Sequence, residues 1–172
     1  MKIKILLTLV IILLMNVSCV NDKYEYDNLF PEKYNVVFSI KNGVSVSTDV
    51  SNKSETSDYL ITLLKGGAQP SMEGDARLEV WTKEELDRYE VIVGRNLEIL
   101  PADSYTLDAT DFHFVAGERW KDCIVSFKSA QVAHIVSEDD SEVTYVLPLR
   151  LVSDQTVDEN KKNIIIEVNI VD

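Results

Sequence analysis

The fold is decided by two apolar segments, Val143-Thr144-Tyr145-Val146-Leu147-Pro148-Leu149-Arg150-Leu151-Val152 and Asn163-Ile164-Ile165-Ile166-Glu167-Val168-Asn169-Ile170-Val171. In each segment, apolar side chains recur at every second position, which is typical of a β-strand with one face in the core. Pro148 has no N–H to donate to a neighbouring strand. We therefore expect its strand to lie at a sheet edge or to carry a bulge there.

Shorter runs of the same character precede these two segments, and turn residues separate them. We expect strands within 34–40, 44–47, 58–65, 76–81, 96–100, 105–107, 111–115 and 119–128. The Asn42-Gly43 pair between the first two runs is a strong hairpin signal, so we expect those two strands to pair with each other.

Two short helices interrupt the strands. Thr82 and Glu85 have the spacing of a capping box, which predicts a helix over 83–89. The apolar spacing over 129–136 suits one or two further helical turns. Many short strands with two helical links predict a mainly β fold, an immunoglobulin-like antiparallel β-sandwich over residues 33–172.

The first nineteen residues carry an export signal. Lys2 and Lys4 precede an apolar run over 5–15, and Ser18 precedes Cys19. A basic start and a short apolar run are typical of a secretory signal peptide rather than a membrane span. The Cys after a small residue indicates a bacterial lipoprotein, although Asn16 departs from the usual Leu of that motif. We expect a signal peptide over 1–18, lipid on Cys19, a tether over 19–32, and anchoring in the outer membrane at the cell surface.

Charge and cysteine content restrict the possible partners. The chain of 172 residues carries 17 Lys and Arg against 29 Asp and Glu, a net charge of −12, which argues against nucleic acid as a partner. With Cys19 lipidated, Cys123 has no partner for a disulfide. It shares strand parity with Val125 and Phe127, so we interpret it as a buried small hydrophobe rather than a reactive thiol.

Several motifs together resemble a known family. They are Lys65-Gly66-Gly67, Ala76 to Val80 followed by Thr82-Lys83-Glu84-Glu85-Leu86, Leu100-Pro101 followed by Tyr105-Thr106-Leu107, and Tyr145 to Leu151. The sequence resembles the domain of unknown function at the N terminus of Bacteroidetes surface lipoproteins and of some family-18 glycoside hydrolases. The resemblance implies an immunoglobulin-like module on an exported lipoprotein, often in gene neighbourhoods for glycan capture. A second domain usually follows in the family, and its activity is not implied for this chain, which ends at Asp172.

The sequence offers little for catalysis or for a metal. The family-18 hydrolase signature begins at Asp108 and Asp111, but His113 and Val115 stand where Asp and Glu are required. His113 and His134 have no further ligand at metal-binding spacing. The acidic run over 138–142 lacks the spacing and the central Gly of a calcium loop, so we interpret it as a solvated turn. We expect neither an enzyme nor a cofactor or metal.

Aromatic side chains are the remaining signal, because sugars stack on exposed indole rings. Trp120 and Asp122 have the strand parity opposite to Cys123, and Trp81 has the parity opposite to Val80. If the apolar parity faces the core, both indoles point outward and could bind a ligand. The alternative is that each indole packs under a neighbouring helix or loop, as the helix directly after Trp81 suggests.

Two functions remain open after these exclusions. The first is a non-enzymatic lipoprotein module that binds glycan or supports a glycan-uptake assembly. The alternative is a structural lipoprotein that contacts outer-membrane proteins and has no sugar site. An exposed aromatic platform with a flanking polar side chain would favour the first, and a large apolar patch or an open sheet edge would favour the second.

Overall fold

The computed structural model describes residues 30–138 and 143–172. The signal peptide, the lipidation site at Cys19, most of the tether and residues 139–142 of the acidic run lie outside the described residues, and those expectations stay predictions. Within the described ranges, no helix is both long and apolar enough to span a membrane.

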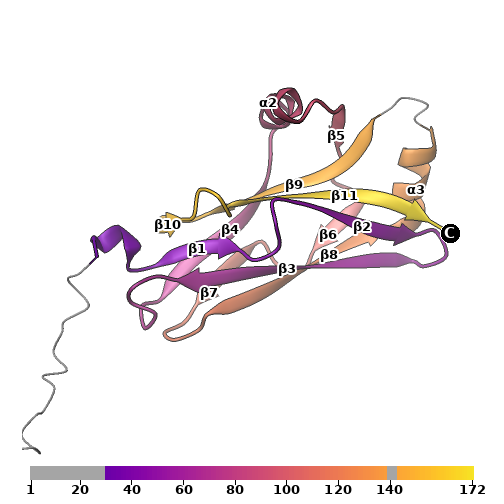
Figure 1. Ribbon diagram of the computed structural model, residues 1–172. Coiled ribbons are helices and arrows are strands. Elements are labelled where there is room, and N and C mark those ends of the chain that lie inside the picture. Colours follow the sequence, from indigo (N-terminus) through magenta and orange to yellow (C-terminus); the bar gives the residue numbers. More distant parts are fainter. Residues whose placement is uncertain (1–29, 139–142) are drawn as a thin grey trace, which may run out of the picture.

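Two sheets pack face to face and form the predicted β-sandwich (Figure 1). The first sheet has the strand order β10 (Thr156–Val157), β1 (Val37–Ile40), β3 (Thr56–Gly66), β8 (Trp120–Lys128) and β6 (Tyr105–Leu107). The second has the order β2 (Ser45–Ser51), β11 (Asn163–Val171), β9 (Thr144–Val152), β4 (Gly74–Val80) and β7 (Asp111–Phe114), and β5 (Leu97–Ile99) also pairs with β9. The helical elements are η2 (Glu32–Tyr34), α2 (Lys83–Val93) and α3 (Ser129–Glu138).

Not every strand pair is antiparallel. β1 pairs with β10, β2 with β11 and β5 with β9 in parallel, whereas the other pairings are antiparallel. Parallel neighbours require a crossover between the two strands, and here the partners are far apart in sequence. This explains why a pattern of local turns does not predict these three pairs.

The inward faces of the two sheets form the main core. Phe38 of β1 and Phe114 of β7 meet there with ring centroids 5.2 Å apart. On β8 the alternation is as predicted, because Cys123, Val125 and Phe127 are buried while Trp120 and Asp122 are exposed. The interpretation of Cys123 as a buried hydrophobe is thus confirmed.

The predicted hairpin at Asn42-Gly43 is wrong. β1 belongs to the first sheet and β2 to the second, so the chain crosses between the sheets at this point. The Asn42 side chain accepts a hydrogen bond from the Thr62 N–H at 2.8 Å and donates one to the Leu60 carbonyl at 2.9 Å. Asn42 therefore ties the crossover to β3, and Gly43 does not adopt the positive φ that a type I′ turn requires.

The expectation that Pro148 lies at a sheet edge or on a bulge is also wrong. β9 lies in the middle of the second sheet, and its register with β11 runs without interruption through Pro148. One side of β9 pairs with β11, and the other side is shared by two strands, with β5 pairing over 144–146 and β4 over 149–152. Pro148 lies between these two stretches, and its carbonyl accepts a hydrogen bond from the Trp81 N–H at the point where β4 has ended. A missing N–H is tolerated there because the ladder is interrupted locally.

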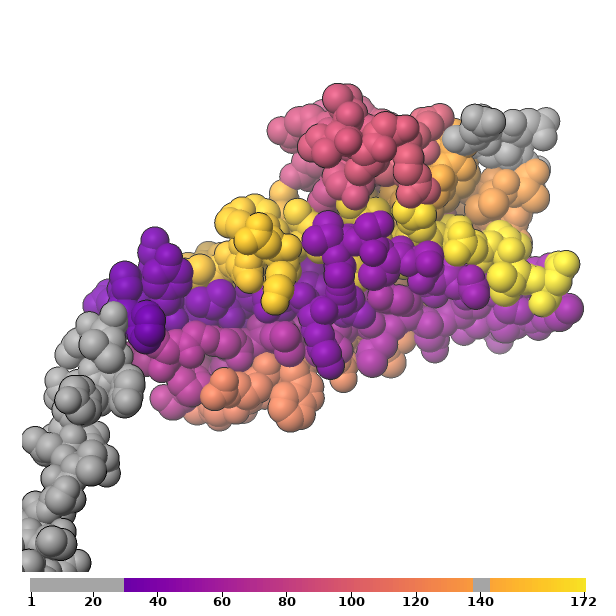
Figure 2. Space-filling view, in the orientation of Figure 1, coloured from indigo at the N-terminus to yellow at the C-terminus, as the bar shows by residue number. Residues whose placement is uncertain are grey.

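A second, smaller apolar cluster lies on the outer face of the second sheet, below α2. It comprises Leu86 of α2, Leu97 of β5, Val146 of β9 and Ile165 of β11. The predicted capping box is confirmed at the start of α2, where Thr82 and Glu85 exchange side-chain to backbone hydrogen bonds. Figure 2 shows α2 standing out from the body of the sandwich.

Candidate functional site

A groove runs between β7 and β8, at the side of the sandwich where the two sheets meet. Its cavity of about 440 Å³ is lined by Ala109, Asp111, Phe112, His113, Glu118, Trp120, Lys121 and Asp122. Among the described residues, β7 pairs only with β4, and β6 pairs with β8 only over 125–127. Two unpaired strand edges therefore border the groove.

Backbone groups of both edges face the groove. The Arg119 carbonyl accepts a hydrogen bond from Lys65 of β3, so the backbone groups of Trp120 and Asp122 point away from β3. Likewise, the Thr110 carbonyl accepts a hydrogen bond from the N–H of Leu78 in β4. The backbone groups of the next residue, Asp111, therefore point to the free side of β7. The groove thus offers N–H donors and carbonyl acceptors beside its side chains.

Trp120 is the most exposed aromatic side chain among the described residues, with 63% of its surface accessible. It begins β8 and lies opposite Leu64 of β3 in the strand register. Asp122 follows on the same face, and one of its carboxylate oxygens accepts a hydrogen bond from the Thr62 hydroxyl at 2.8 Å. The structure therefore brings the predicted pair together, an open indole beside a carboxylate whose orientation is fixed.

The turn before Trp120 is held from inside by a buried lysine. Lys65 points inward from β3 and is only 2% exposed, and its ammonium group donates to the carbonyls of Met72 and Val115 at 2.6 and 2.8 Å. Gly117 has a φ of 79°, a left-handed conformation that glycine adopts without strain. The chain therefore reverses sharply between β7 and β8 and brings their edges next to each other.

An ion pair lies among the side chains that line the groove. The Lys121 ammonium lies 2.9 Å from the Glu118 carboxylate, which also accepts a hydrogen bond from the Val115 N–H at 3.1 Å. The hydrogen bond from Lys121 lowers the pKa of Glu118 below its ordinary value. The Glu118 carboxylate is therefore held in its charged form beside the Lys121 ammonium.

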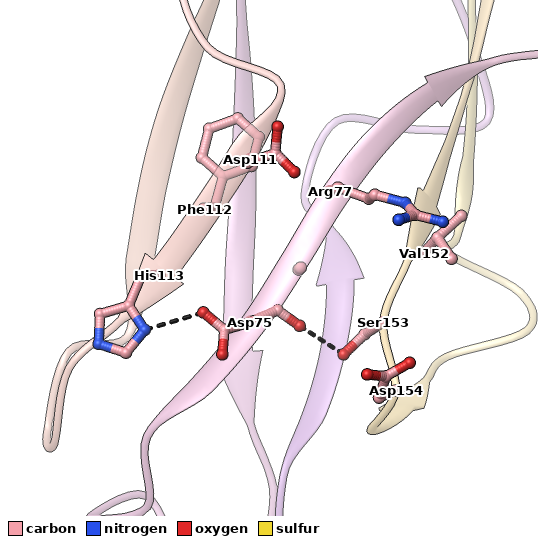
Figure 3. Close-up of a pocket in the computed structure, with 9 residues that line it drawn as sticks. Asp75, Arg77, Asp111, Phe112, His113, Val152, Ser153 and Asp154 are labelled. Atoms are coloured by element: carbon pink, nitrogen blue, oxygen red, sulfur yellow. Dashed lines mark hydrogen bonds and ion pairs between the residues drawn. The ribbon is translucent and has the colours of Figure 1, made fainter.

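A second cavity of about 420 Å³ lies on the other side of β7 (Figure 3). Asp75 of β4 is the register partner of His113, and their side chains form a hydrogen bond of 2.8 Å. The Ser153 hydroxyl donates a hydrogen bond to the Asp75 carbonyl at 2.5 Å, and Figure 3 shows the Asp154 side chain beside Ser153. This cavity shares Asp111, Phe112 and His113 with the groove.

Trp81, the third predicted ligand-binding residue, lies elsewhere. Its ring meets Tyr89 of α2 edge to face, with centroids 5.8 Å apart, and it packs against the small cluster below α2. Its indole nitrogen is buried and has no hydrogen-bond partner in the structure. The structure thus separates Trp81 from the Trp120 groove and gives it the packed position that the following helix suggested.

Metal binding and thiol chemistry find little support in the parts of the chain that the structure describes. No group of three or more metal-ligating side chains gathers within residues 30–138 and 143–172. Burial raises the pKa of the Cys123 thiol to about 12, which leaves it protonated and unreactive. What the groove can do is bind, through an apolar ring face, charged side chains and backbone hydrogen-bonding groups.

Strand parity alone did not identify the other groups of the groove. His113 and Asp111 come from β7 in the second sheet, Glu118 directly follows the turn before β8, and Lys121 lies in β8. The alternation of Phe112 and Phe114 did indicate that Asp111 and His113 face outward. It could not show which strand of the other sheet lies beside them.

Comparison with known proteins finds one matching protein family. A family model described as an N-terminal domain matches residues 23–158. No curated protein matches the sequence.

Solved structures share the fold at low sequence identity. A candidate carbohydrate binding protein from Bacteroides ovatus is 15% identical with a TM-score of 0.62, covering 77% of this chain and 36% of its own. A multidomain protein including DUF1735 from the same species is 18% identical with a TM-score of 0.56, covering 79% and 45%. EndoBT-3987 from Bacteroides thetaiotaomicron, solved with a Man5GlcNAc product, is 19% identical with a TM-score of 0.51, covering 72% and 28%. The chain thus spans less than half the length of each of these proteins.

Proposed function

The chain belongs to this family of N-terminal domains, and from that membership and the groove we propose that it is a non-enzymatic, glycan-binding module of a lipid-anchored envelope protein. One neighbour in fold is described as a candidate carbohydrate binding protein, and another was solved with a glycan product. Both likenesses concern the fold, so the groove itself must carry the proposal.

The observation that carries it is the exposed indole of Trp120. A large aromatic ring left 63% accessible on a folded surface has an unused apolar face, which fits the apolar face of a sugar ring. Asp122 can accept a hydrogen bond from a sugar hydroxyl, and the Lys121 ammonium can donate one. Hydroxyl groups both donate and accept, so they also suit the backbone groups of the two free edges.

Calorimetry with neutral oligosaccharides tests this proposal, using the full chain kept soluble in detergent. Stacking on an aromatic ring contributes on the order of 1–3 kcal/mol, so Trp120→Ala should weaken binding by about 5-fold to 150-fold. Tyr34→Ala is the matched control, because Tyr34 is 43% exposed and does not line the groove. Binding that survives in Trp120→Ala would remove Trp120 from the site, and no binding to any glycan would refute the function.

Anchoring through lipid on Cys19 is part of the proposal, with the outer membrane as the location and its outer surface as the side. It is supported by the basic residues, the apolar run and the Ser18-Cys19 pair at the start of the chain. Cys19→Ala should move the protein out of the membrane fraction when cells are fractionated. Equal membrane retention of the variant would refute anchoring, and protease treatment of intact cells would test surface display.

A role in protein interaction is the second candidate, and the surface of α2 favours it. Val91 and Ile92 are adjacent, and they are 85% and 80% exposed at the end of a helix that stands out from the sandwich (Figure 2). Adjacent exposed apolar side chains can form part of a protein–protein contact surface. If Val91→Ser with Ile92→Ser abolishes cross-linking to an outer-membrane protein in cells and Trp120→Ala does not, this second function is favoured.

A further inference from the structure

The groove at Trp120 and the cavity at Asp75 are two parts of one surface. Asp111, Phe112 and His113 line both, so a ligand that leaves the groove over β7 enters the second cavity directly. Each cavity lies within the range of about 300–1,000 Å³ that is typical of small-ligand sites. Because the two cavities share three lining residues, a chain of sugar rings could extend from one into the other.

The charged side chains along the two cavities favour neutral glycans over acidic ones. Lys121 is paired with Glu118, and Arg77 is paired with Glu79 at 2.7 Å, so neither cation is left to attract an anion. Three carboxylates remain along the two cavities without an ion pair in the described structure, those of Asp111, Asp122 and Asp154. The field over the site is therefore negative, and the net charge of −12 adds to it.

A negative field disfavours a polysaccharide that carries carboxylate or sulfate groups, because bringing like charges close together costs free energy. Carboxylate oxygens accept hydrogen bonds from sugar hydroxyls, however, and charge-assisted hydrogen bonds are the stronger kind. The side chains of Asp122 and Asp111 are already oriented by the hydroxyls of Thr62 and Thr110 at 2.8 and 2.9 Å. The site is thus built for hydroxyl groups without formal charge.

We propose that the groove and the cavity are two subsites for a neutral glycan chain of at least two sugar rings, with one ring on Trp120 and another next to Asp75 and Asp154. This inference rests on the proposed function and adds the class of ligand and its length. The Asp154 carboxylate is the group of the second subsite that a sugar hydroxyl reaches most readily, because it is exposed and has no hydrogen-bond or ion-pair partner among the described residues.

The experiment compares chain lengths and charge by calorimetry with the full chain in detergent. The probes are gluco-, manno- and xylo-oligosaccharides of one, two and four rings, together with tetragalacturonate as the acidic chain. We expect a neutral tetrasaccharide to bind about tenfold more tightly than its monosaccharide, since a second set of hydrogen bonds is added. Tetragalacturonate should not bind measurably.

Variants separate the two subsites. Asp154→Ala should remove most of the gain in affinity that a longer chain gives, whereas Asp49→Ala, which removes an exposed carboxylate on β2, should leave that gain unchanged. If binding depends on Trp120 but is the same for one and four rings, or if tetragalacturonate binds as well as the neutral chain, the two-subsite inference is wrong and the proposed function stands. If no neutral glycan binds the unmodified chain, both are wrong.

Discussion

Leu149→Ala should destabilise the protein more than truncation of an outward-facing leucine, because the Leu149 side chain is buried in the main core. Its side chain is 1% exposed on β9, and its register partners are Val80 of β4 and Ile164 of β11. Truncation of a leucine at such a position costs about 2–5 kcal/mol, since apolar contacts are lost and a cavity remains. For a domain of this size, about 2–4 °C of melting temperature corresponds to each kcal/mol, so the melting temperature should fall by about 4–20 °C.

Leu60→Ala is the matched control for this measurement. Leu60 lies on β3, is 51% exposed and faces outward, so the same truncation should cost less than about 1 kcal/mol. Urea denaturation followed by tryptophan fluorescence gives both free energies of unfolding, and equal slopes would show that the two variants unfold to the same extent. Equal destabilisation by the two substitutions would refute the inward orientation of Leu149 and with it the arrangement of β9.

Three further predictions follow from other parts of the structure. The Cys123 thiol, with its pKa raised to about 12 by burial, should resist alkylation at about pH 8 until urea unfolds the chain, and rapid labelling of the folded protein would contradict its position. The pKa values of Glu79 and Glu85 are lowered from 4.5, by a hydrogen bond from Arg150 and by the Thr82 N–H respectively. Their contribution to stability is therefore complete above about pH 4.5 and is lost as the pH falls through the lowered values, and thermal melts of Arg150→Ala should show a weaker acid dependence than those of the unmodified chain. Lys65→Met should destabilise by about 1–3 kcal/mol in urea denaturation, because it takes the ammonium donor away from the Met72 and Val115 carbonyls, and an unchanged stability would show that water replaces the ammonium group.

Much of the fold could be predicted from the sequence, because local patterns set its elements. Alternation placed Cys123 inward and Trp120 outward, and the capping box placed the start of α2. The pairing of strands was harder. Asn42 has the sequence of a hairpin, but its side chain bonds to β3, and Pro148 occupies a gap between two partners of β9 that no local signal reveals.

The candidate site was predictable only in the half that comes from one strand. Trp120 and Asp122 are separated by a single residue, so their common face follows from the period of a strand. Asp111 and His113 reach the same groove from the other sheet, and that neighbourhood depends on how the two sheets pack. The alternation of apolar and polar residues shows on which face of its strand a residue lies. It does not show which residues of the other sheet lie next to it.

The two ends of the described chain lie at opposite ends of the sandwich. Val37 at the start of β1 pairs with Gly66, and Trp120 pairs with Leu64, so the groove lies near the end where the N-terminal segment enters. Figure 1 shows Asp172 at the other end, beyond β11. A reporter protein or an affinity resin attached after Asp172 would therefore leave the groove unobstructed. Attachment to a sensor chip close to Val37, in contrast, would bring the chip near the groove and hinder access for a large polysaccharide.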